Sequence, residues 1–213
     1  LITNHTGVDR LSRRNVDLFA ARTDVQLVRV FSPEHGLTGQ LDEELIADAV
    51  DPTTGTPVVS LYRPDQRRPK QEMLADLDAL VFDIQDVGAR FYTYTTTMAY
   101  AIEEAAKAGI PIYILDRPNP ITGTRVEGPL LDAQHHSFIG YMDLPVRHGM
   151  TVGELALFFN SMKRVGADVR VVPMRGWRRA MWFDETGLPW VNPSPNIRSL
   201  DQAILYPGIA LLE

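Results

Sequence analysis

Short apolar runs that suit β-strands alternate with helical patterns along most of the chain. The strand-like runs lie at 25–31, 58–62, 79–84, 110–115 and 169–173. Helical patterns separate them at 12–23, 71–77 and 93–107, and another begins at 151. This alternation is typical of βαβ units, in which parallel strands form one sheet and the helices cover its faces. The sequence therefore predicts an α/β fold with a mainly parallel sheet.

Local signals support several of these elements. Thr151-Val152-Gly153-Glu154 is a capping box, which begins a helix by satisfying its first backbone N–H groups. Gly109, followed by Pro111, predicts the end of the helix over 93–107. The region 37–57 is polar and rich in turn residues, so we expect a long loop there. The first helix, over 12–23, is expected to bury Leu11, Val16, Phe19 and Ala20.

Polar clusters follow three of these apolar runs, and a fourth cluster ends a further strand-like run at Val146. These clusters are 33–36, which contains Glu34 and His35, and then 83–88, 116–120 and 146–149. The carboxyl ends of parallel strands lie at one edge of a sheet, where ligands of open α/β folds bind. We therefore expect the four clusters to meet around one polar site.

Composition excludes several kinds of site. The 213 residues are 45% hydrophobic and 23% charged, which is ordinary for a globular protein and sufficient for a core without staples. Because the net charge is −6 and no long basic block occurs, we expect no nucleic-acid partner. With no cysteine, the chain has no disulfide, thiolate metal site or cysteine nucleophile. Nothing in the spacing of Asp, Glu and His requires a metal, and no nucleotide-binding glycine motif is present.

Both ends of the sequence lack the usual boundary signals. The chain begins with Leu1-Ile2-Thr3-Asn4, as if within a strand, and its last residues contain no turn signal. We interpret the sequence as a fragment. No run of 18 apolar residues predicts a membrane span, and no signal peptide is visible.

Glu34 and His35 are the first candidates for chemistry. They follow a strand-like run, and Gly36 permits the sharp turn that would direct both side chains into a crevice. A carboxylate beside an imidazole is suited to general acid–base catalysis. The alternative is an ordinary surface turn after a strand.

The segment 83–94 offers a second set of candidates. Gln85, Asp86, Arg90, Tyr92 and Tyr94 combine polar groups, one guanidinium and two aromatic rings. Sugars bind to such mixtures because their C–H faces are apolar and their edges carry hydroxyls. The alternatives are aspartates that cap turns, aromatic rings in the core and a surface arginine.

The remaining candidates are single residues near strand ends or turns. Asp116 and Arg117 form either part of the site or a structural ion pair, and two prolines stiffen the loop around Asn119. His148 precedes a helix N-terminus and is either functional or structural. His5 is expected to line the same crevice, Glu127 is a carboxylate in a tight turn, and His135 and His136 are expected at the surface.

In its motifs, the chain resembles the exo-β-N-acetylmuramidase family (NamZ-type, YbbC-like) almost from end to end. The resemblance rests on the segments 3–7, 32–36, 60–62, 82–94, 115–120, 126–129, 147–151, 193–196 and 206–208. It implies a Rossmann-like, three-layer catalytic domain over 1–213, with a smaller C-terminal domain absent from this chain. It also implies removal of terminal β-linked N-acetylmuramic acid from the non-reducing end of peptidoglycan fragments, with no cofactor.

The resemblance and the residues together suggest roles. Glycosidases generally use two carboxyl groups. Glu34 is the expected general acid/base, with His35 tuning it or relaying its proton, and the second carboxyl is expected at Glu127, Glu44 or Asp86, in that order. The substrate's own acetamido group is an alternative nucleophile. Arg90 or Arg117 would bind the lactyl carboxylate, Tyr92 and Tyr94 the sugar face, and Asn119 and His148 its polar groups; the remaining candidates are His5, Gln85 and Asp116.

Two rival functions fit the same sequence. One is a muropeptide- or sugar-binding module without catalysis, and the other is a metal-dependent esterase or deacetylase on the same scaffold. A peptidoglycan substrate favours a location outside the cytoplasm, although a cytoplasmic one also fits the sequence. The sequence does not indicate an oligomeric state.

Overall fold

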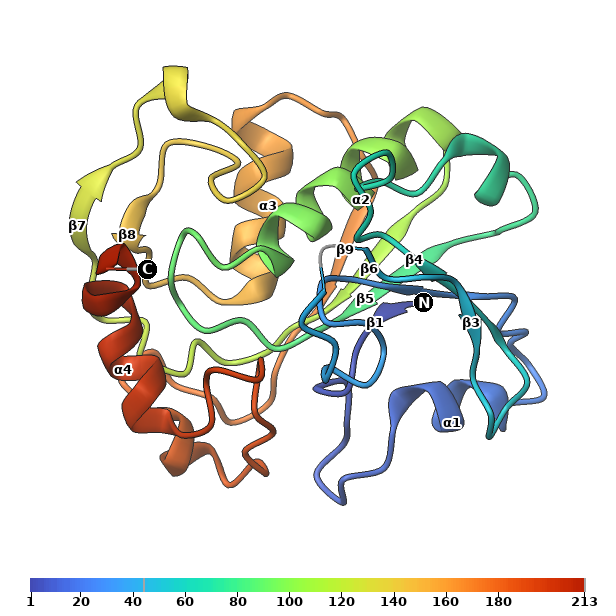
Figure 1. Cartoon of the computed structure of the whole chain (residues 1–213), viewed down its shortest axis with the longest axis horizontal. Helices are drawn as coiled ribbons and strands as arrows, with labels where there is room; N and C mark the ends of the chain where they lie inside the picture. The colour runs from blue at the N-terminus through green and yellow to red at the C-terminus, as the bar shows by residue number, and fades with distance from the viewer. Residues whose placement is uncertain (44, 213) are drawn as a thin grey trace.

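A seven-stranded sheet forms the centre of the protein. The computed structural model describes residues 1–43 and 45–212. The strands follow the order β3-β4-β2-β1-β5-β6-β9, and all neighbours are parallel except β3 and β4 (Figure 1). Their bounds are β1 (Ile2–Thr3), β2 (Val30–Ser32), β3 (Ala49–Val50), β4 (Pro57–Ser60), β5 (Leu80–Asp83), β6 (Ile112–Leu115) and β9 (Val169–Val172). The mainly parallel α/β sheet predicted from the sequence is confirmed.

The order in which strands are added to the sheet reverses at β1. From β1 the chain proceeds to β2 and β4 on one side, then returns to β5 on the other side. This is the strand order of a Rossmann-like fold, and the switch point lies between β1 and β5. The carboxyl ends of all six parallel strands therefore lie at one edge of the sheet, as expected.

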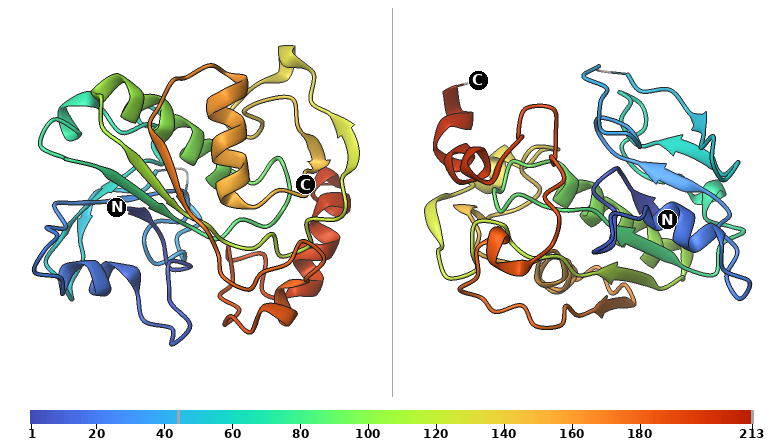
Figure 2. Two further views of the ribbon diagram at one scale, coloured as in Figure 1. Left: turned by 180° about the vertical axis from the view of Figure 1, so that it is seen from behind. Right: turned by 90° about the horizontal axis from the view of Figure 1, so that it is seen from below.

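Helices cover both faces of the sheet, which gives three layers. Helix α1 (Asn15–Ala20) lies on one face, and α2 (Tyr94–Ala108) and α3 (Val152–Met162) lie side by side on the other (Figures 1 and 2). A second, two-stranded antiparallel sheet pairs β7 (Glu127–Leu130) with β8 (Pro145–Arg147). Helix α4 (Leu200–Ile209) follows near the end of the chain. Four short 3₁₀ helices are η1 (Gln71–Met73), η2 (Ala133–His135), η3 (Phe183–Thr186) and η4 (Ala210–Leu212).

The two predicted helix signals are both confirmed. Thr151 accepts a hydrogen bond from the backbone N–H of Glu154, whose side chain accepts one from the Thr151 N–H. Gly109 ends α2 in the left-handed region at φ 67°, a conformation that favours glycine. Each signal acts through backbone hydrogen bonds or backbone conformation at one helix end, and both form in the folded protein.

Several boundaries differ from the predictions. The helix expected over 12–23 is shorter because Ser12 has φ 58°, outside the helical region, and Leu11 is 73% exposed. Only the end of the run 25–31 joins the sheet, as part of β2. Strand β3 lies within the expected loop over 37–57, β7 and α4 were not predicted, and the strand-like run that ends at Val146 corresponds to β8. Pro207 lies inside α4, which explains why that helix was not predicted.

The main core lies between the sheet and the pair α2 and α3. Side chains from the sheet and both helices are almost completely buried there, among them Ile2, Phe82, Ile112, Met98, Ile102 and Phe159. A smaller cluster under α1 contains Leu1, Val16, Val30 and Val58. The larger core fixes the start of α2 against the carboxyl edge of the sheet.

Asp51 is a buried carboxylate directly after β3, and its contacts should make the stability of the protein depend on pH. Asp51 is 1% exposed and accepts hydrogen bonds from Arg14 at 2.8 and 3.1 Å and from Thr54. The Arg14 bonds outweigh burial and lower the Asp51 pKa from 3.8 to about 2. We expect Asp51→Asn to cost about 2 kcal/mol of unfolding free energy at pH 7.

Because the pKa of Asp51 is lower in the folded protein, its contribution is complete above about pH 4 and is lost as the pH falls toward 2. Urea unfolding across this range should show the difference between wild type and Asp51→Asn narrowing. Asp24→Asn is the control, since the Asp24–Arg22 pair is exposed. If the difference in unfolding free energy between wild type and Asp51→Asn does not change with pH, ionised Asp51 does not supply this stability.

Candidate active site

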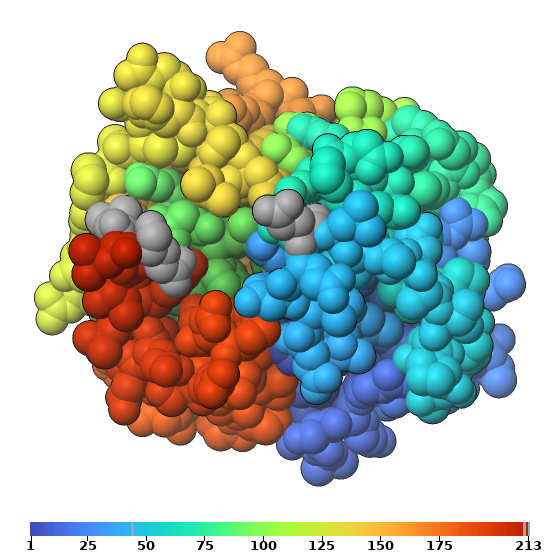
Figure 3. All heavy atoms as spheres, viewed as in Figure 1, coloured from blue at the N-terminus to red at the C-terminus, as the bar shows by residue number. Residues whose placement is uncertain are grey.

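A cleft of ≈ 1220 Å³ opens at the carboxyl edge of the sheet. Its walls come from four segments: the loop after β2, residues 90–94 at the entry to α2, the segment between β7 and β8, and the region from 194 through α4 to η4. In Figure 3 the green segment that includes the start of α2 lies recessed between the blue, yellow and red segments. A site therefore forms from parts of the chain that are far apart in sequence.

Glu34 is a half-buried carboxylate in the wall of this cleft. The Thr93 hydroxyl donates a hydrogen bond to its carboxylate. Burial, and secondarily the Glu34 carboxylate beside its phenol, raise the pKa of Tyr62. The Thr93 hydrogen bond thus restricts the orientation of Glu34. The expectation that Glu34 faces a cleft agrees with this placement.

The turn that carries Glu34 is unusual at the backbone. His35 has φ 66° and Gly36 has φ 71°, so a non-glycine residue occupies the left-handed region beside the predicted glycine. The His35 ring bonds through Nδ1 to the Leu41 carbonyl at 2.8 Å. This contact ties the turn to the following loop. His35 lines the cleft, but its proposed role toward the Glu34 proton stays a prediction.

His5 lies close to this turn without lining the cleft. Its Nε2 bonds to the Asn192 carbonyl at 2.6 Å, and its ring packs against Gly39, where a Cβ would overlap it. Burial, and secondarily the nearby charge of His35, lower the pKa of His5. His5 therefore supports the loop rather than reaching into the cleft.

Tyr92 and Tyr94 form the floor of the cleft. Their rings meet edge to face at 4.8 Å, and the residues are only 7% and 2% exposed. The Tyr94 hydroxyl donates to the Pro193 carbonyl at 3.1 Å. Burial raises the pKa of both phenols. The two tyrosines line the site as predicted, but little ring face is free to stack on a sugar.

Arg90 also lines the cleft, and its guanidinium is partly occupied. It donates to the carbonyls of Pro129 and Leu144, at 2.8 and 2.5 Å, which connects the start of α2 to β7 and β8. Burial lowers its pKa. A guanidinium has five N–H donors, so some stay free for a substrate carboxylate.

Four predicted residues form a buried polar network next to the cleft instead of lining it. Gln85 donates to the Asp86 and Pro118 carbonyls, and the Asp86 carboxylate lies 3.3 Å from the His148 Nε2. The Met150 N–H donates to the His148 Nδ1, and Asn119 donates to the Met150 carbonyl. Because all four side chains are at most 4% exposed, their contacts serve to hold the loops together.

The other candidates lie elsewhere, which corrects the expectation of a single convergent site. Glu127 is on β7 with its side chain 54% exposed, paired with Arg147 at 2.7 Å. Asp116 and Arg117 line a separate pocket that shares no lining residue with the cleft. Glu44 lies outside the described residues. His135, expected at the surface, is exposed and lines the cleft, and His136 pairs with Asp143.

Sequence reasoning missed several lining residues. Asp42, Ser194, Asn196 and Gln202 supply polar groups to the cleft, and Thr93 supplies the bond to Glu34. Thr93 stands between two predicted aromatic residues, so its neighbours gave a signal. The others lie in loops or in α4, whose approach to the cleft depends on tertiary structure. Among the described residues, no three His, Asp or Glu side chains cluster as a metal site requires.

None of the helices in the described part of the chain has the length and apolarity needed to cross a bilayer.

Comparisons with known proteins agree with one another. Residues 1–201 match the family model described as exo-beta-N-acetylmuramidase NamZ, N-terminal. The peptidoglycan beta-N-acetylmuramidase NamZ of Bacillus subtilis (strain 168) is 47% identical over 215 residues, which cover 100% of this chain and 51% of that protein.

Two solved structures of DUF1343 family proteins from Bacteroides fragilis NCTC 9343 are similar in fold. The TM-scores are 0.92 and 0.83, at 41% and 36% identity. Each match covers 99% of this chain, and 54% and 55% of the respective structures. The chain spans about half the length of the relatives it matches. On these matches, it belongs to the exo-β-N-acetylmuramidase NamZ family and corresponds to the N-terminal part of its members.

Proposed function

We propose that the chain supplies the catalytic half of a glycosidase that releases terminal β-linked N-acetylmuramic acid from the non-reducing end of peptidoglycan fragments. The relative named as a peptidoglycan β-N-acetylmuramidase supports the substrate. The observation that carries the chemistry is the half-buried Glu34 carboxylate, held in the cleft wall by a hydrogen bond from Thr93.

Glu34 is the general acid in this proposal. Cleavage of a glycosidic bond needs a proton on the leaving oxygen, and a positioned carboxylic acid supplies it. The Thr93 hydroxyl restricts the carboxylate to one orientation. His35 and Asp42 follow in the same loop, so the acidic and imidazole groups of the cleft come chiefly from one turn.

Two routes fit the second half of the reaction. Glu127 and Asp86 do not line the cleft, whereas Asp42 does, with its side chain 74% exposed. In the first route Asp42 serves as the second carboxylate. In the second route the substrate's 2-acetamido group attacks the anomeric carbon, a substrate-assisted mechanism known among glycosidases.

The lactyl carboxylate of N-acetylmuramic acid distinguishes it from N-acetylglucosamine. Arg90 is the proposed partner because it is the sequence-predicted cation that lines the cleft. Arg117 no longer fits that role, since it lines the other pocket and bonds to Asp83.

The proposal is tested with chromogenic glycosides and the full-length protein. We expect release from the β-N-acetylmuramide and little or none from the β-N-acetylglucosaminide, because only the former carries the carboxylate that Arg90 would bind. Equal release from both would contradict the muramic acid assignment. Binding without turnover would support a sugar-binding module, and loss of activity with a chelator would support a metal-dependent hydrolase.

A further inference from the structure

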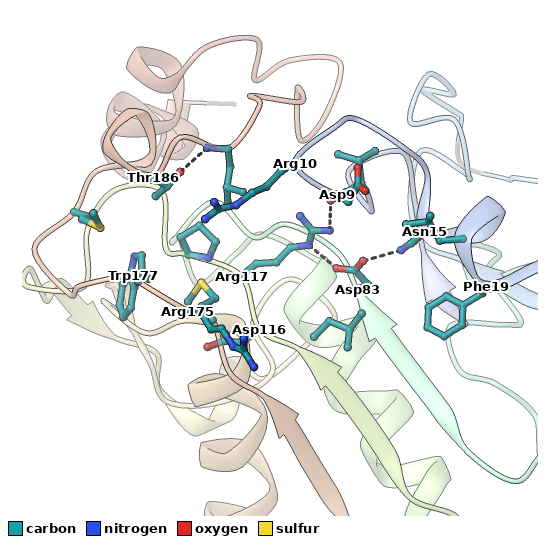
Figure 4. A pocket seen from close by; sticks show the side chains of 18 residues that line it. Asp9, Arg10, Asn15, Phe19, Asp83, Asp116, Arg117, Arg175, Trp177 and Thr186 are labelled. Carbon is teal, nitrogen blue, oxygen red and sulfur yellow. Dashed lines mark hydrogen bonds and ion pairs between the residues drawn. The ribbon is translucent and has the colours of Figure 1, made fainter. Parts of the chain in front are cut away.

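A second cavity of ≈ 470 Å³ lies at the carboxyl ends of β5 and β6, beside α1 (Figure 4). Asp83 ends β5, the strand that forms one side of the switch point, and lines this cavity. Ligands of open α/β sheets bind at such switch points. The volume is also within the range of small-molecule sites, roughly 300–1,000 Å³.

The walls of this pocket are mainly apolar. The side chains that form them come from α1, the end of β6 and the segment after β9, and include Leu18, Phe19, Leu115, Met174, Trp177 and Leu188. Such walls favour an apolar or aromatic molecule, and a flat ring can pack against Phe19 or Trp177.

Arg117 and Asp83 form the central ion pair of the pocket, and their charges cancel. The Arg117 Nε donates to the Asp83 carboxylate at 2.5 Å, and the Asn15 amide donates to the other carboxylate oxygen at 2.8 Å. Figure 4 shows these contacts between Arg117, Asp83 and Asn15. Neither charge of this pair is free for a ligand.

The other two acids at the pocket are also satisfied. Asp116 accepts hydrogen bonds from the Gly153 N–H at 2.7 Å and from the Thr151 hydroxyl at 3.2 Å, and burial raises its pKa. Asp9 pairs with Arg13 at 2.6 Å and accepts two backbone N–H bonds. The carboxylate oxygens of both residues are therefore already engaged by donors of the protein itself.

Two cations at the pocket have no such partner. No hydrogen bond or ion pair of the Arg10 or Arg175 side chains is found among the described residues, and both line the pocket. Figure 4 shows them on different sides of Arg117, which is itself bound to Asp83. Two exposed guanidiniums without a partner, at an apolar pocket in a chain of net charge −6, favour a negative ligand there.

We propose that this pocket binds a soluble organic anion, separate from the saccharide in the cleft. Its apolar or aromatic body packs on Leu18, Phe19 and Trp177, and its carboxylate, sulfonate or phosphate group pairs with Arg10 and Arg175. The proposal does not depend on the reaction assigned to Glu34, because the two cavities share no lining residue.

A pair of naphthalene dyes tests the proposal in the full chain. The anionic probe is 1-anilinonaphthalene-8-sulfonate, and the neutral one is N-phenyl-1-naphthylamine. We expect the sulfonate to bind with one site per chain and the Arg10→Gln/Arg175→Gln variant to raise its Kd about tenfold or more. The Kd of the neutral dye should change little. The matched control, Arg125→Gln/Arg178→Gln, removes two exposed arginines outside the pocket and should keep the wild-type Kd within about twofold.

A second pair of variants locates the dye. Leu18→Trp fills the pocket and should abolish binding of the sulfonate, whereas Ile139→Trp in the cleft should leave it intact. Far-ultraviolet circular dichroism checks that each variant is folded. Equal Kd values for both arginine pairs, or loss of binding only with Ile139→Trp, would overturn the proposal. So would association with anionic phospholipid vesicles in a protein that does not bind the soluble dye, which would assign the arginines to a membrane surface.

Discussion

Replacing Glu34 with glutamine should reduce hydrolysis of a β-N-acetylmuramide by at least about 10²-fold in the full-length protein, because positioned acid–base groups contribute roughly 10²–10⁴-fold. Glutamine keeps the size of the side chain and the contact with the Thr93 hydroxyl, but it has no proton to give. The loss should therefore appear in kcat, with substrate binding retained. Initial rates over a range of substrate concentrations measure both quantities.

The matched control is Glu127→Gln. Glu127 was the first candidate for the second carboxylate from the sequence, yet it is exposed and pairs with Arg147 outside the cleft. This variant should keep wild-type activity within a few-fold, since an exposed ion pair contributes about 0–1 kcal/mol. A loss with Glu127→Gln as large as with Glu34→Gln would show that the cleft described here is not the whole site.

Removing Asp83 should destabilise the protein by about 3–5 kcal/mol, the usual cost of breaking a buried ion pair. The Asp83 and Arg117 side chains are 6% and 14% exposed, so Asp83→Ala leaves a guanidinium without its counter-charge in a low-dielectric position. It also removes the acceptor of the Asn15 amide. Such a loss is a large part of a typical stability of about 5–15 kcal/mol. Urea unfolding at neutral pH measures it.

An exposed pair provides the comparison for Asp83. Asp168 and Arg170 also form an ion pair, but both side chains are more than half exposed. Asp168→Ala should therefore change the unfolding free energy by less than about 1 kcal/mol. The double variant Asp83→Leu/Arg117→Met should recover part of the loss, because no unpaired charge remains. If Asp83→Ala costs no more than Asp168→Ala, the ion pair does not stabilise the switch point.

The fold was predictable where the signals are local. Apolar runs located β5, β6 and β9, and Gly109 and Thr151 marked helix ends that the structure confirms. The prediction failed where tertiary contacts decide the structure. Only the end of the run 25–31 pairs in the sheet, and the antiparallel pairing of β7 with β8 has no sequence signature of its own.

The candidate site was predictable only in part, for a geometric reason. Strand order at one edge placed Glu34, Arg90, Tyr92 and Tyr94 around the cleft. Periodicity does not give the position along that edge, so it did not separate these residues from Asp116 and Arg117. Which side chains meet across neighbouring strands also depends on the register between those strands.

Two ion pairs show how register decides partners. Arg117 follows β6 and binds Asp83 at the end of the neighbouring β5, not the adjacent Asp116. Glu127 lies opposite Arg147 in the pairing of β7 with β8, and this places its carboxylate in an ion pair instead of the cleft. Neither pairing is visible without the three-dimensional arrangement.

The most direct measurement is a crystal structure of the full-length Glu34→Gln protein with an uncleaved disaccharide that carries non-reducing β-N-acetylmuramic acid. We expect the sugar to occupy the cleft, with the side-chain amide of residue 34 about 3 Å from the glycosidic oxygen. We also expect the lactyl carboxylate to pair with Arg90. A sugar bound beside Arg10 and Arg175, or one whose glycosidic oxygen is far from residue 34, would contradict these expectations.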